Sequence, residues 1–175
     1  MRLPAKAGKI PGIEKFDASF FGMNDRQANE MDPQFKICHE TTFEAIIDAG
    51  LDPVSLRGDR TGMFIGYCYT DAWSAQLQVD ATLYNSQWTE QFSEVSKSFG
   101  FKGPCLAYDS ACASSFSAFN EAVKLLEANV IDTAIVAGVS VSTSPVTAQG
   151  FRSLGMTSLE GQSRCMDKHA NGYVR

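Results

Sequence analysis

The sequence predicts an α/β fold, and three observations lead to this prediction. A strand–helix–strand pattern spans residues 104–141, where two short apolar runs flank a longer helical pattern. An apolar run without charged residues, at residues 62–68, is bounded by turn residues. A helical pattern with recognisable start and stop signals covers residues 33–49. Short apolar strands that alternate with helices are typical of a parallel sheet covered by helices.

The first part of the chain is predicted to hold a loop followed by a helix. Residues 1–12 contain prolines and glycines but no apolar periodicity, which indicates a loop. Asp32 is suited to cap a helix, Pro33 suits the first helical position, and Gly50 supplies a stop signal. Apolar residues recur at helical spacing between these signals, so residues 33–49 are expected to form an amphipathic helix.

The next part is predicted to hold a strand and then some helix. Residues 62–68 suit a strand that is buried on both faces of a parallel sheet. In residues 70–100 the apolar side chains recur irregularly, so helix is expected for parts of this stretch, without defined ends.

The strand–helix–strand pattern is predicted to form a βαβ unit with strands at residues 105–108 and 133–141 and a helix at residues 113–128. The second strand is apolar on both sides, which is typical of a central parallel strand. The helix is expected to carry on one face the apolar residues Phe116, Phe119, Ala122, Val123 and Leu126. A further helix is predicted at residues 144–155 and a turn at residues 171–172.

Composition limits the class of protein. With 175 residues, 44% hydrophobic and 20% charged, the chain suits one globular domain with a sizeable core. The net charge is -5 and no run of Lys and Arg is present, so neither nucleic acid nor a membrane surface is an expected partner. No apolar stretch approaches the roughly 18 residues of a membrane-spanning helix, and the N-terminus does not resemble a signal peptide. A cytoplasmic location is therefore expected.

The cysteines indicate neither a disulfide framework nor a zinc site. Their number is odd and no C-x-x-C spacing occurs. The five residues are Cys38, Cys68, Cys105, Cys112 and Cys165. We expect reduced thiols, most of them buried, and no bound metal or cofactor within this chain.

One segment has the features of a catalytic turn. Residues 109–115 read D-S-A-C-A-S-S and lie where a predicted strand turns sharply into a helix. Small neighbours tolerate a strained turn that lifts one side chain out of the sheet, as in a nucleophile elbow. The helix N-terminus favours a thiolate at Cys112, and its unpaired N–H groups are suited to stabilise an oxyanion. Asp109 is expected to anchor the turn by accepting backbone N–H groups. From position alone, Cys112 is either a nucleophile or a buried structural thiol.

Five segments match, in order, the motifs of one known family. Residues 16–22 read F-D-A-S-F-F-G against F-D-A-x-F-F-G, and residues 31–34 read M-D-P-Q against M-D-P-Q. Residues 109–115 correspond to D-T-A-C-S-S-S, and residues 154–158 to L-G-M-L-S. Residues 171–175 resemble the start of D/N-G-Y-x-R-G-E-G. The chain thus resembles the β-ketoacyl synthase family of condensing enzymes.

The resemblance implies a thiolase-like fold built from two similar halves, of which residues 1–175 would be the N-terminal part of one domain, truncated at both ends. It also implies that Cys112 takes an acyl chain from the phosphopantetheine of an acyl carrier domain. Decarboxylation of a malonyl thioester would then supply the carbanion that attacks this chain. The family's two histidines and lysine that assist these steps belong to the second half and match no position here. The family's members are homodimers.

The resemblance is strongest, at residues 8–10 and 55–58, to animal-type fatty acid synthases, with type I polyketide synthases close behind. Fatty acid biosynthesis is the expected setting, and a polyketide ketosynthase or a decayed non-catalytic copy are the alternatives. The family's N-R-x-S element is replaced here by Ser93-Glu94-Val95-Ser96, which exchanges a cation for an anion. This departure is what the hypothesis of a diverged copy rests on.

Two histidines are present, and neither falls on a family motif. His39 lies on the predicted helix and is expected at the surface or satisfied internally. His169 lies in a stretch rich in turn residues and is a candidate base for Cys112. A cysteine hydrolase that uses Cys112 and His169 is therefore a rival hypothesis, although the chain lacks a C-G-S-C-W type signature.

Overall fold

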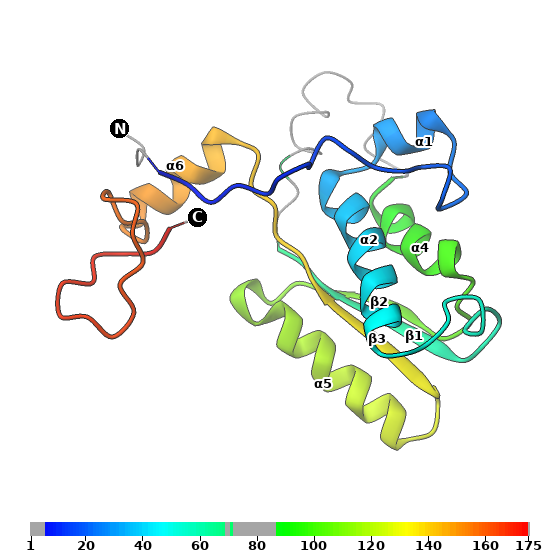
Figure 1. The fold of residues 1–175 in the computed structure, drawn as a ribbon. Coiled ribbons are helices and arrows are strands. Elements are labelled where there is room, and N and C mark those ends of the chain that lie inside the picture. Colours follow the sequence, from blue (N-terminus) through cyan, green and yellow to red (C-terminus); the bar gives the residue numbers. More distant parts are fainter. Residues whose placement is uncertain (1–5, 69–70, 72–86, 175) are drawn as a thin grey trace. The chain divides into compact units, whose positions relative to one another are not determined.

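The computed structural model describes residues 6–68, 71 and 87–174. The chain divides into two compact units, Glu14–Val141 and residues 6–13 together with 142–174, and each is described by itself (Figure 1). The larger unit contains a three-stranded sheet with helices on both faces. Within the described residues, no helix is both long and apolar enough to cross a membrane.

The sheet is parallel and has β1 at its centre. Its strands are β1 (Thr61–Gly66), β2 (Cys105–Tyr108) and β3 (Thr133–Gly138), in the order β2–β1–β3. Met63 pairs with Cys105 on one side and with Ile135 on the other. The predicted βαβ unit is confirmed, because β2 and β3 flank β1 and the connection between them is helical. The prediction of a central strand at residues 133–141 is wrong for the described sheet, in which β3 is an edge strand and β1 is buried throughout.

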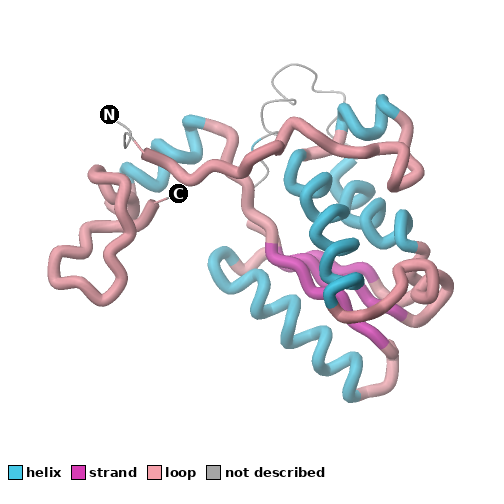
Figure 2. The backbone as a smooth tube through the Cα atoms, in the orientation of Figure 1, coloured by secondary structure: helices cyan, strands magenta, loops and turns pink. Residues whose placement is uncertain are grey.

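Helices cover both faces of the sheet. The helices concerned are α5 (Ser114–Glu127) on one face, and α2 (Pro33–Asp48) and α4 (Gln87–Phe99) on the other, as Figures 1 and 2 show. Side chains alternate along β1, so that Met63 and Ile65 join the cluster under α2 and α4. Phe64 points the opposite way and packs with Ala118 and Ala122 of α5. The side chains of Met63, Phe64 and Ile65 are completely buried.

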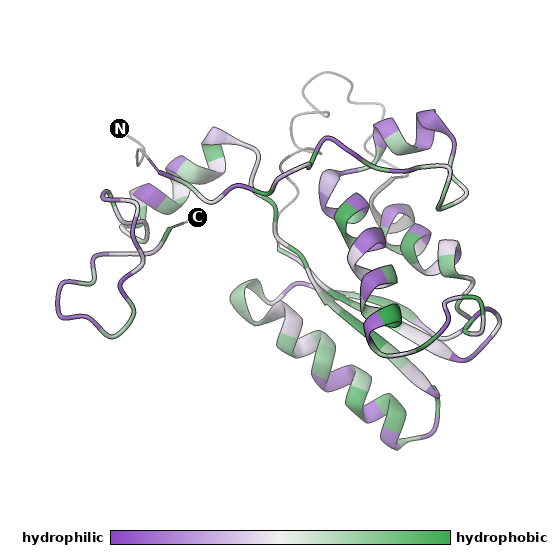
Figure 3. Cartoon of the chain, in the orientation of Figure 1, coloured by the Kyte–Doolittle hydropathy of each residue, from purple (hydrophilic) through white to green (hydrophobic). Residues whose placement is uncertain are grey.

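The apolar face expected for α5 is wrong in its largest members. The residues that α5 buries are small, namely Ser114, Ala118 and Ala122. Phe116 is 78% exposed and Phe119 is 55% exposed, so the large apolar residues form a stripe on the side away from the sheet. Figure 3 shows hydrophobic positions along much of this helix. The helix therefore has two apolar sides, and the smaller side chains face the sheet.

The helix predicted at residues 33–49 is confirmed together with its signals. The Asp32 carboxylate accepts the N–H of Gln34 at 2.9 Å, and Pro33 is the first helical residue. Gly50 follows the helix with a φ of +75°, and its N–H donates to the carbonyl of Ile47 at 2.9 Å. The sequence therefore determines both ends of α2.

Two other helices were predicted less well. Helix α4 confirms the expectation of helix in part of residues 70–100, whereas residues 70 and 72–86 lie outside the described part. The short helix α1 (Asp25–Glu30) was not predicted. Its capping box joins Asn24 and Gln27, whose side chains each accept the backbone N–H of the other residue.

The smaller unit contains α6 (Pro145–Ser153), which confirms the helix predicted at residues 144–155. Ser144 caps it by accepting the N–H of Val146 at 3.2 Å. The turn predicted at residues 171–172 is wrong. A turn lies earlier, where the N–H of Ala170 donates to the carbonyl of Asp167 at 3.0 Å. The chain then runs beside residues 156–158, with Tyr173 paired to Thr157 in a parallel bridge.

His39 is completely buried and satisfied inside the larger unit. Its Nδ1 lies 2.7 Å from the carbonyl oxygen of Phe35, which only accepts, so Nδ1 carries the proton and Nε2 is left to accept from Ser98 Oγ at 3.3 Å. The rings of Phe16 and Phe21 pack edge-on against the imidazole. The surface position allowed for His39 is therefore wrong, because Phe16 and Phe21 cover this part of α2.

Burial lowers the pKa of His39 below its usual 6.5, while the bond to Phe35 and the carboxylate of Glu94 act in the opposite direction. The unfolded chain then takes up this proton at a higher pH than the folded chain does. We expect the free energy of unfolding to fall as pH falls from about 6.5 toward the lower folded-state value. Denaturant midpoints of the wild-type protein and His39→Gln, measured at about pH 7.5 and pH 5, check this. The wild-type protein should lose more stability than the variant. An equal loss in the two proteins would show that His39 does not carry the effect.

Candidate active site

Cys112 lies in a short connection between β2 and α5. It is the middle residue of a 3₁₀ turn, Ala111–Ala113, which passes directly into the first turn of α5 at Ser114. The side chain of Cys112 is exposed to solvent. The alternative that Cys112 is a buried structural thiol therefore does not describe this structure, and its sulfur is accessible to a substrate.

The turn before Cys112 has an unusual backbone conformation. Ala111 has a φ of +53°, a left-handed conformation that is uncommon for a residue with a side chain. Asp109 stabilises the turn, because its Oδ1 accepts the N–H of Ala111 at 3.2 Å. The anchoring role predicted for Asp109 is thereby confirmed. The small side chain of Ala111 limits the steric cost of this conformation.

Serine side chains join the turn to the helix. The Oγ of Ser114 accepts the N–H of Ser110 at 3.0 Å and donates to the carbonyl of Ala111 at 2.7 Å. The hydroxyls of Ser110 and Ser117 are 2.7 Å apart and share a hydrogen bond. Together these bonds connect both sides of Cys112 to the first two turns of α5. Ser117 was not singled out from the sequence, because its partner Ser110 lies outside the helix and no helical spacing relates the two residues.

The N-terminal end of α5 has no side-chain cap. Neither Ser110 nor Ala113, the residues that precede the two helical segments, forms a side-chain capping bond. Side-chain caps normally satisfy N–H groups at this position, and the helix dipole favours negative charge there. A negatively charged oxygen formed next to Cys112 would therefore meet a favourable electrostatic environment.

Two of the other thiols, Cys38 and Cys105, are less exposed than Cys112. Burial raises the pKa of the Cys38 thiol to about 11 and also raises that of Cys105, so both are protonated at neutral pH. The expectation that most cysteines are buried is wrong, because Cys38 alone is classed as buried and Cys165 is exposed. Cys165 lies in an irregular segment of the smaller unit rather than next to a helix N-terminus.

The anion at Glu94 has a partner within its own helix. Its carboxylate lies 2.7 Å from Lys97 Nζ, one turn further along α4. The anion that replaces the family's cation thus forms an ion pair with Lys97, at the favourable i, i+3 spacing. The charge exchange at Glu94 is therefore weak support for the hypothesis of a decayed copy.

His169 lies in the smaller unit, whereas Cys112 lies in the larger one. Its backbone N–H donates to Asp167 Oδ1 at 2.7 Å, and its carbonyl accepts from Arg164 Nη1 at 3.5 Å. The two units are described separately, so a pairing of His169 with Cys112 stays a hypothesis.

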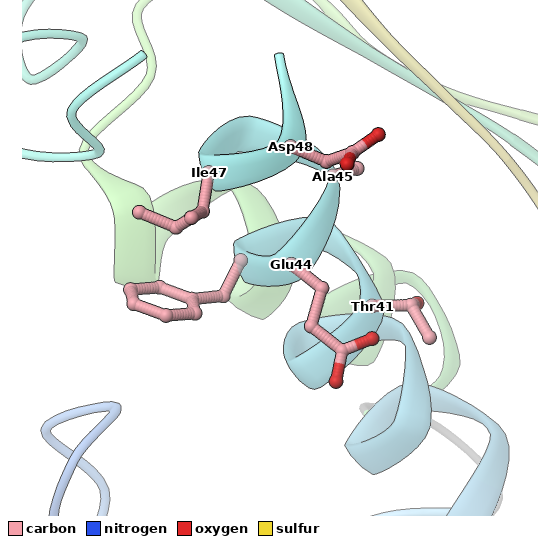
Figure 4. Close-up of a pocket in the computed structure, with 6 residues that line it drawn as sticks. Thr41, Glu44, Ala45, Ile47 and Asp48 are labelled. Atoms are coloured by element: carbon pink, nitrogen blue, oxygen red, sulfur yellow. The ribbon is translucent and has the colours of Figure 1, made fainter. Parts of the chain in front are cut away.

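An open pocket occurs on the outer surface of α2 (Figure 4). It is lined by Thr41, Phe43, Glu44, Ala45, Ile47 and Asp48. None of the residues predicted to be functional lines it, and it contains no nucleophile activated by a neighbouring base. Among the described residues, no three His, Cys, Asp or Glu side chains are grouped so as to hold a metal ion.

Comparison with known proteins assigns the chain to a family. A family model described as "Beta-ketoacyl synthase, N-terminal domain" matches residues 2–175. The fatty acid synthase of Anser anser anser is 37% identical over 178 residues, which cover 99% of this chain and 51% of that protein. The probable polyketide synthase 45 of Dictyostelium discoideum is 35% identical over 163 residues, covering 91% of this chain and 5% of that protein.

A solved structure shares the fold. The ketosynthase from module 6 of the bacillaene synthase of Bacillus subtilis 168 superposes with a TM-score of 0.84 at 29% identity, covering 95% of this chain and 29% of that chain. The expected α/β, thiolase-like fold is thereby confirmed. The chain spans about half of the fatty acid synthase that it matches and a small part of the polyketide synthase. The chain belongs to the β-ketoacyl synthase family and matches its N-terminal domain.

Proposed function

We propose that Cys112 is the acyl-accepting nucleophile of a β-ketoacyl-[acyl carrier protein] synthase, which condenses the bound acyl chain with a malonyl thioester. The observation that carries this proposal is the placement of an exposed cysteine in a strained turn at an uncapped helix N-terminus, in a member of the condensing-enzyme family. Covalent catalysis of this kind divides one difficult reaction into two easier ones.

In the first step the Cys112 thiolate attacks the carbonyl carbon of an acyl thioester. A new C–S bond forms, the negative charge moves to the carbonyl oxygen, and the carrier thiolate then leaves and takes up a proton. In the second step a malonyl thioester loses CO₂, and the resulting carbanion attacks the acyl group on Cys112. The product is a β-ketoacyl thioester, and the Cys112 thiolate is regenerated.

The residues around Cys112 serve the first step. The positive end of the α5 dipole is suited to stabilise the oxyanion, because Ser110 and Ala113 leave that end without a side-chain cap. The hydrogen bonds of Ser110, Ser114 and Ser117 hold the turn in one geometry. Preorganisation of this kind avoids rearrangement during the reaction.

The proposed partners follow from the proposed reaction. The acyl and malonyl groups would arrive on the phosphopantetheine of an acyl carrier domain, and the active protein would be a cytoplasmic homodimer. We propose fatty acid biosynthesis as the setting, because the similarity to the fatty acid synthase extends over 99% of the chain. The similarity to a polyketide synthase, at 35% identity, makes a polyketide ketosynthase the second candidate.

The test is a condensation assay with the full-length protein that contains these residues. The protein is incubated with an acyl thioester and a malonyl thioester, and CO₂ and β-ketoacyl thioester are measured together. We expect one CO₂ for each product and no product when either substrate is omitted. Release of free acid without CO₂ would support the hydrolase hypothesis with Cys112 and His169. Absence of both products would support a non-catalytic copy.

A further inference from the structure

Two glycines lie side by side beneath the first turn of α5. Gly66 at the end of β1 is paired in register with Gly138 at the end of β3. Both occupy the face of the sheet that α5 covers, because Gly66 is two residues from Phe64, which packs against α5. We call Gly66 and Gly138 the glycine seat.

The glycine seat permits a very close approach of the helix. A Cβ added to Gly66 would lie 2.4 Å from the backbone N of Ser115 and 2.5 Å from the backbone C of Ser114. A Cβ added to Gly138 would lie 3.0 Å from the Cβ of Ser115. Neither Gly66 nor Gly138 is among the glycines with positive φ, so the close approach, rather than backbone conformation, is what requires glycine at these positions.

The strand is less free to move than the helix end. Gly66 belongs to the central strand, where it is paired with Tyr108 on one side and Gly138 on the other. Its carbonyl accepts the N–H of Val139 at 2.9 Å. A side chain at position 66 would therefore displace the first turn of α5 more readily than it would displace β1.

A displacement of this first turn would reach Cys112. The side chain of Ser114 is hydrogen-bonded to the N–H of Ser110 and to the carbonyl of Ala111, which both precede the nucleophile. The contacts at Ser114 and Ser115 are two and three residues from Cys112 in sequence. A chain of contacts therefore runs from the glycine seat through Ser114 and Ser115 to the turn that holds Cys112.

We propose that Gly66 and Gly138 are positioning residues, which set the location of the Cys112 thiol by allowing the first turn of α5 to rest on the sheet backbone. This proposal deepens the proposed function and rests on it, because it assigns the acyl-transfer geometry of Cys112 to two residues outside its motif. A displacement of about 1 Å is enough to slow a positioned reaction by roughly 10²-fold.

Gly66→Ala tests the glycine seat, and Gly103→Ala is its matched control. A Cβ on Gly103 would lie 2.6 Å from the backbone of Thr61, at the opposite end of β1. Each variant thus creates a clash with backbone, that of α5 in Gly66→Ala and that of β1 in Gly103→Ala, and both are expected to lower the denaturant midpoint. Only Gly66→Ala is expected to slow acyl transfer to Cys112, by about 10²-fold, when both variants are assayed in the full-length protein under conditions where they are folded.

A second pair of variants tests the contact with the other glycine. Gly138→Ala meets only the side chain of Ser115, so Ser115→Gly removes the atom with which it collides. We expect Gly138→Ala to slow acyl transfer less than Gly66→Ala does. We expect the double variant Gly138→Ala/Ser115→Gly to recover the rate of Ser115→Gly alone. Ser115→Gly should not rescue Gly66→Ala, whose clash is with backbone. If Gly66→Ala does not fold, the Gly138 pair carries the test.

The alkylation rate of Cys112 by iodoacetamide, followed across pH by peptide mapping, separates this proposal from the proposed function. Alkylation needs no acyl substrate, so its rate reports on the environment of the thiol whether or not the protein accepts an acyl group. A wild-type protein that loads no acyl group would contradict the proposed function but not the glycine seat. We expect the rate and its pH profile to change in Gly66→Ala and to stay unchanged in Gly103→Ala. A folded Gly66→Ala with wild-type alkylation and transfer rates, or an equal slowing in Gly103→Ala, would overturn the glycine seat.

Discussion

Replacing Cys112 by Ala is expected to lower the rate of β-ketoacyl thioester formation by at least about 10⁴-fold, because a nucleophile that forms a covalent intermediate cannot be replaced by its neighbours. The methyl group of alanine cannot form a thioester, so no acyl group is held for the carbanion to attack. The measurement is the initial rate of product formation with saturating acyl and malonyl thioesters. Stability should change little, since the Cys112 side chain is exposed and fills no part of the core.

Two controls make the Cys112→Ala result specific. Cys165→Ala removes the other exposed thiol and is expected to leave the condensation rate unchanged. Release of CO₂ from the malonyl thioester is expected to persist in Cys112→Ala, because the family resemblance assigns decarboxylation to groups other than the nucleophile. A Cys112→Ala variant that still forms product at a rate near that of the wild-type protein would exclude Cys112 as the nucleophile.

The 175-residue chain by itself is expected to form no β-ketoacyl thioester, even with Cys112 intact. The family resemblance assigns two histidines and a lysine to the later steps, and none of them corresponds to a residue of this chain. Of the two histidines that are present, His39 is enclosed by Phe16 and Phe21 with both ring nitrogens engaged. It is therefore unable to reach a substrate at Cys112.

The isolated chain and the full-length protein are compared in one condensation assay at equal concentrations of Cys112. We expect product from the full-length protein and none above background from the chain. Acyl transfer to Cys112 without condensation is the partial reaction that the proposed function assigns to residues of this chain. Steady condensation by the isolated chain would contradict the assignment of the later steps to residues outside it.

The parts of the fold that were predicted correctly have local causes. Asp32, Pro33 and Gly50 determine the ends of α2 through capping bonds that involve only near neighbours. The short apolar runs at β1 and β2, bounded by turn residues, favour strands. Signals of this kind can be read without knowledge of the tertiary structure.

The parts that were predicted wrongly depend on tertiary packing. Hydrophobic periodicity counted Phe116 and Phe119 with the buried face of α5, but the residues that the helix buries are the small Ser114, Ala118 and Ala122. The burial of His39 depends on an aromatic segment about 20 residues earlier in the chain. Neither effect has a local signature.

The sequence predicted the nucleophile of the candidate site, but it did not predict all of the residues that hold this nucleophile in place. The small residues around Cys112 and the anchoring role of Asp109 follow from the motif itself. The glycine seat does not, because a close approach between separate segments leaves no pattern within either one. An isolated glycine in a strand signals that something approaches closely, but it does not say what.

The site at which an acyl group becomes covalently attached tests the central claim most directly. The wild-type full-length protein is incubated with an acyl thioester in the absence of malonyl thioester, digested, and mapped by mass spectrometry. We predict one acyl group per chain at this domain, on the peptide that contains Cys112, with Cys38 and Cys105 unmodified because burial keeps their thiols protonated. An acyl group found first on Cys165 or on any other residue of these 175, with Cys112 unmodified, would contradict the account.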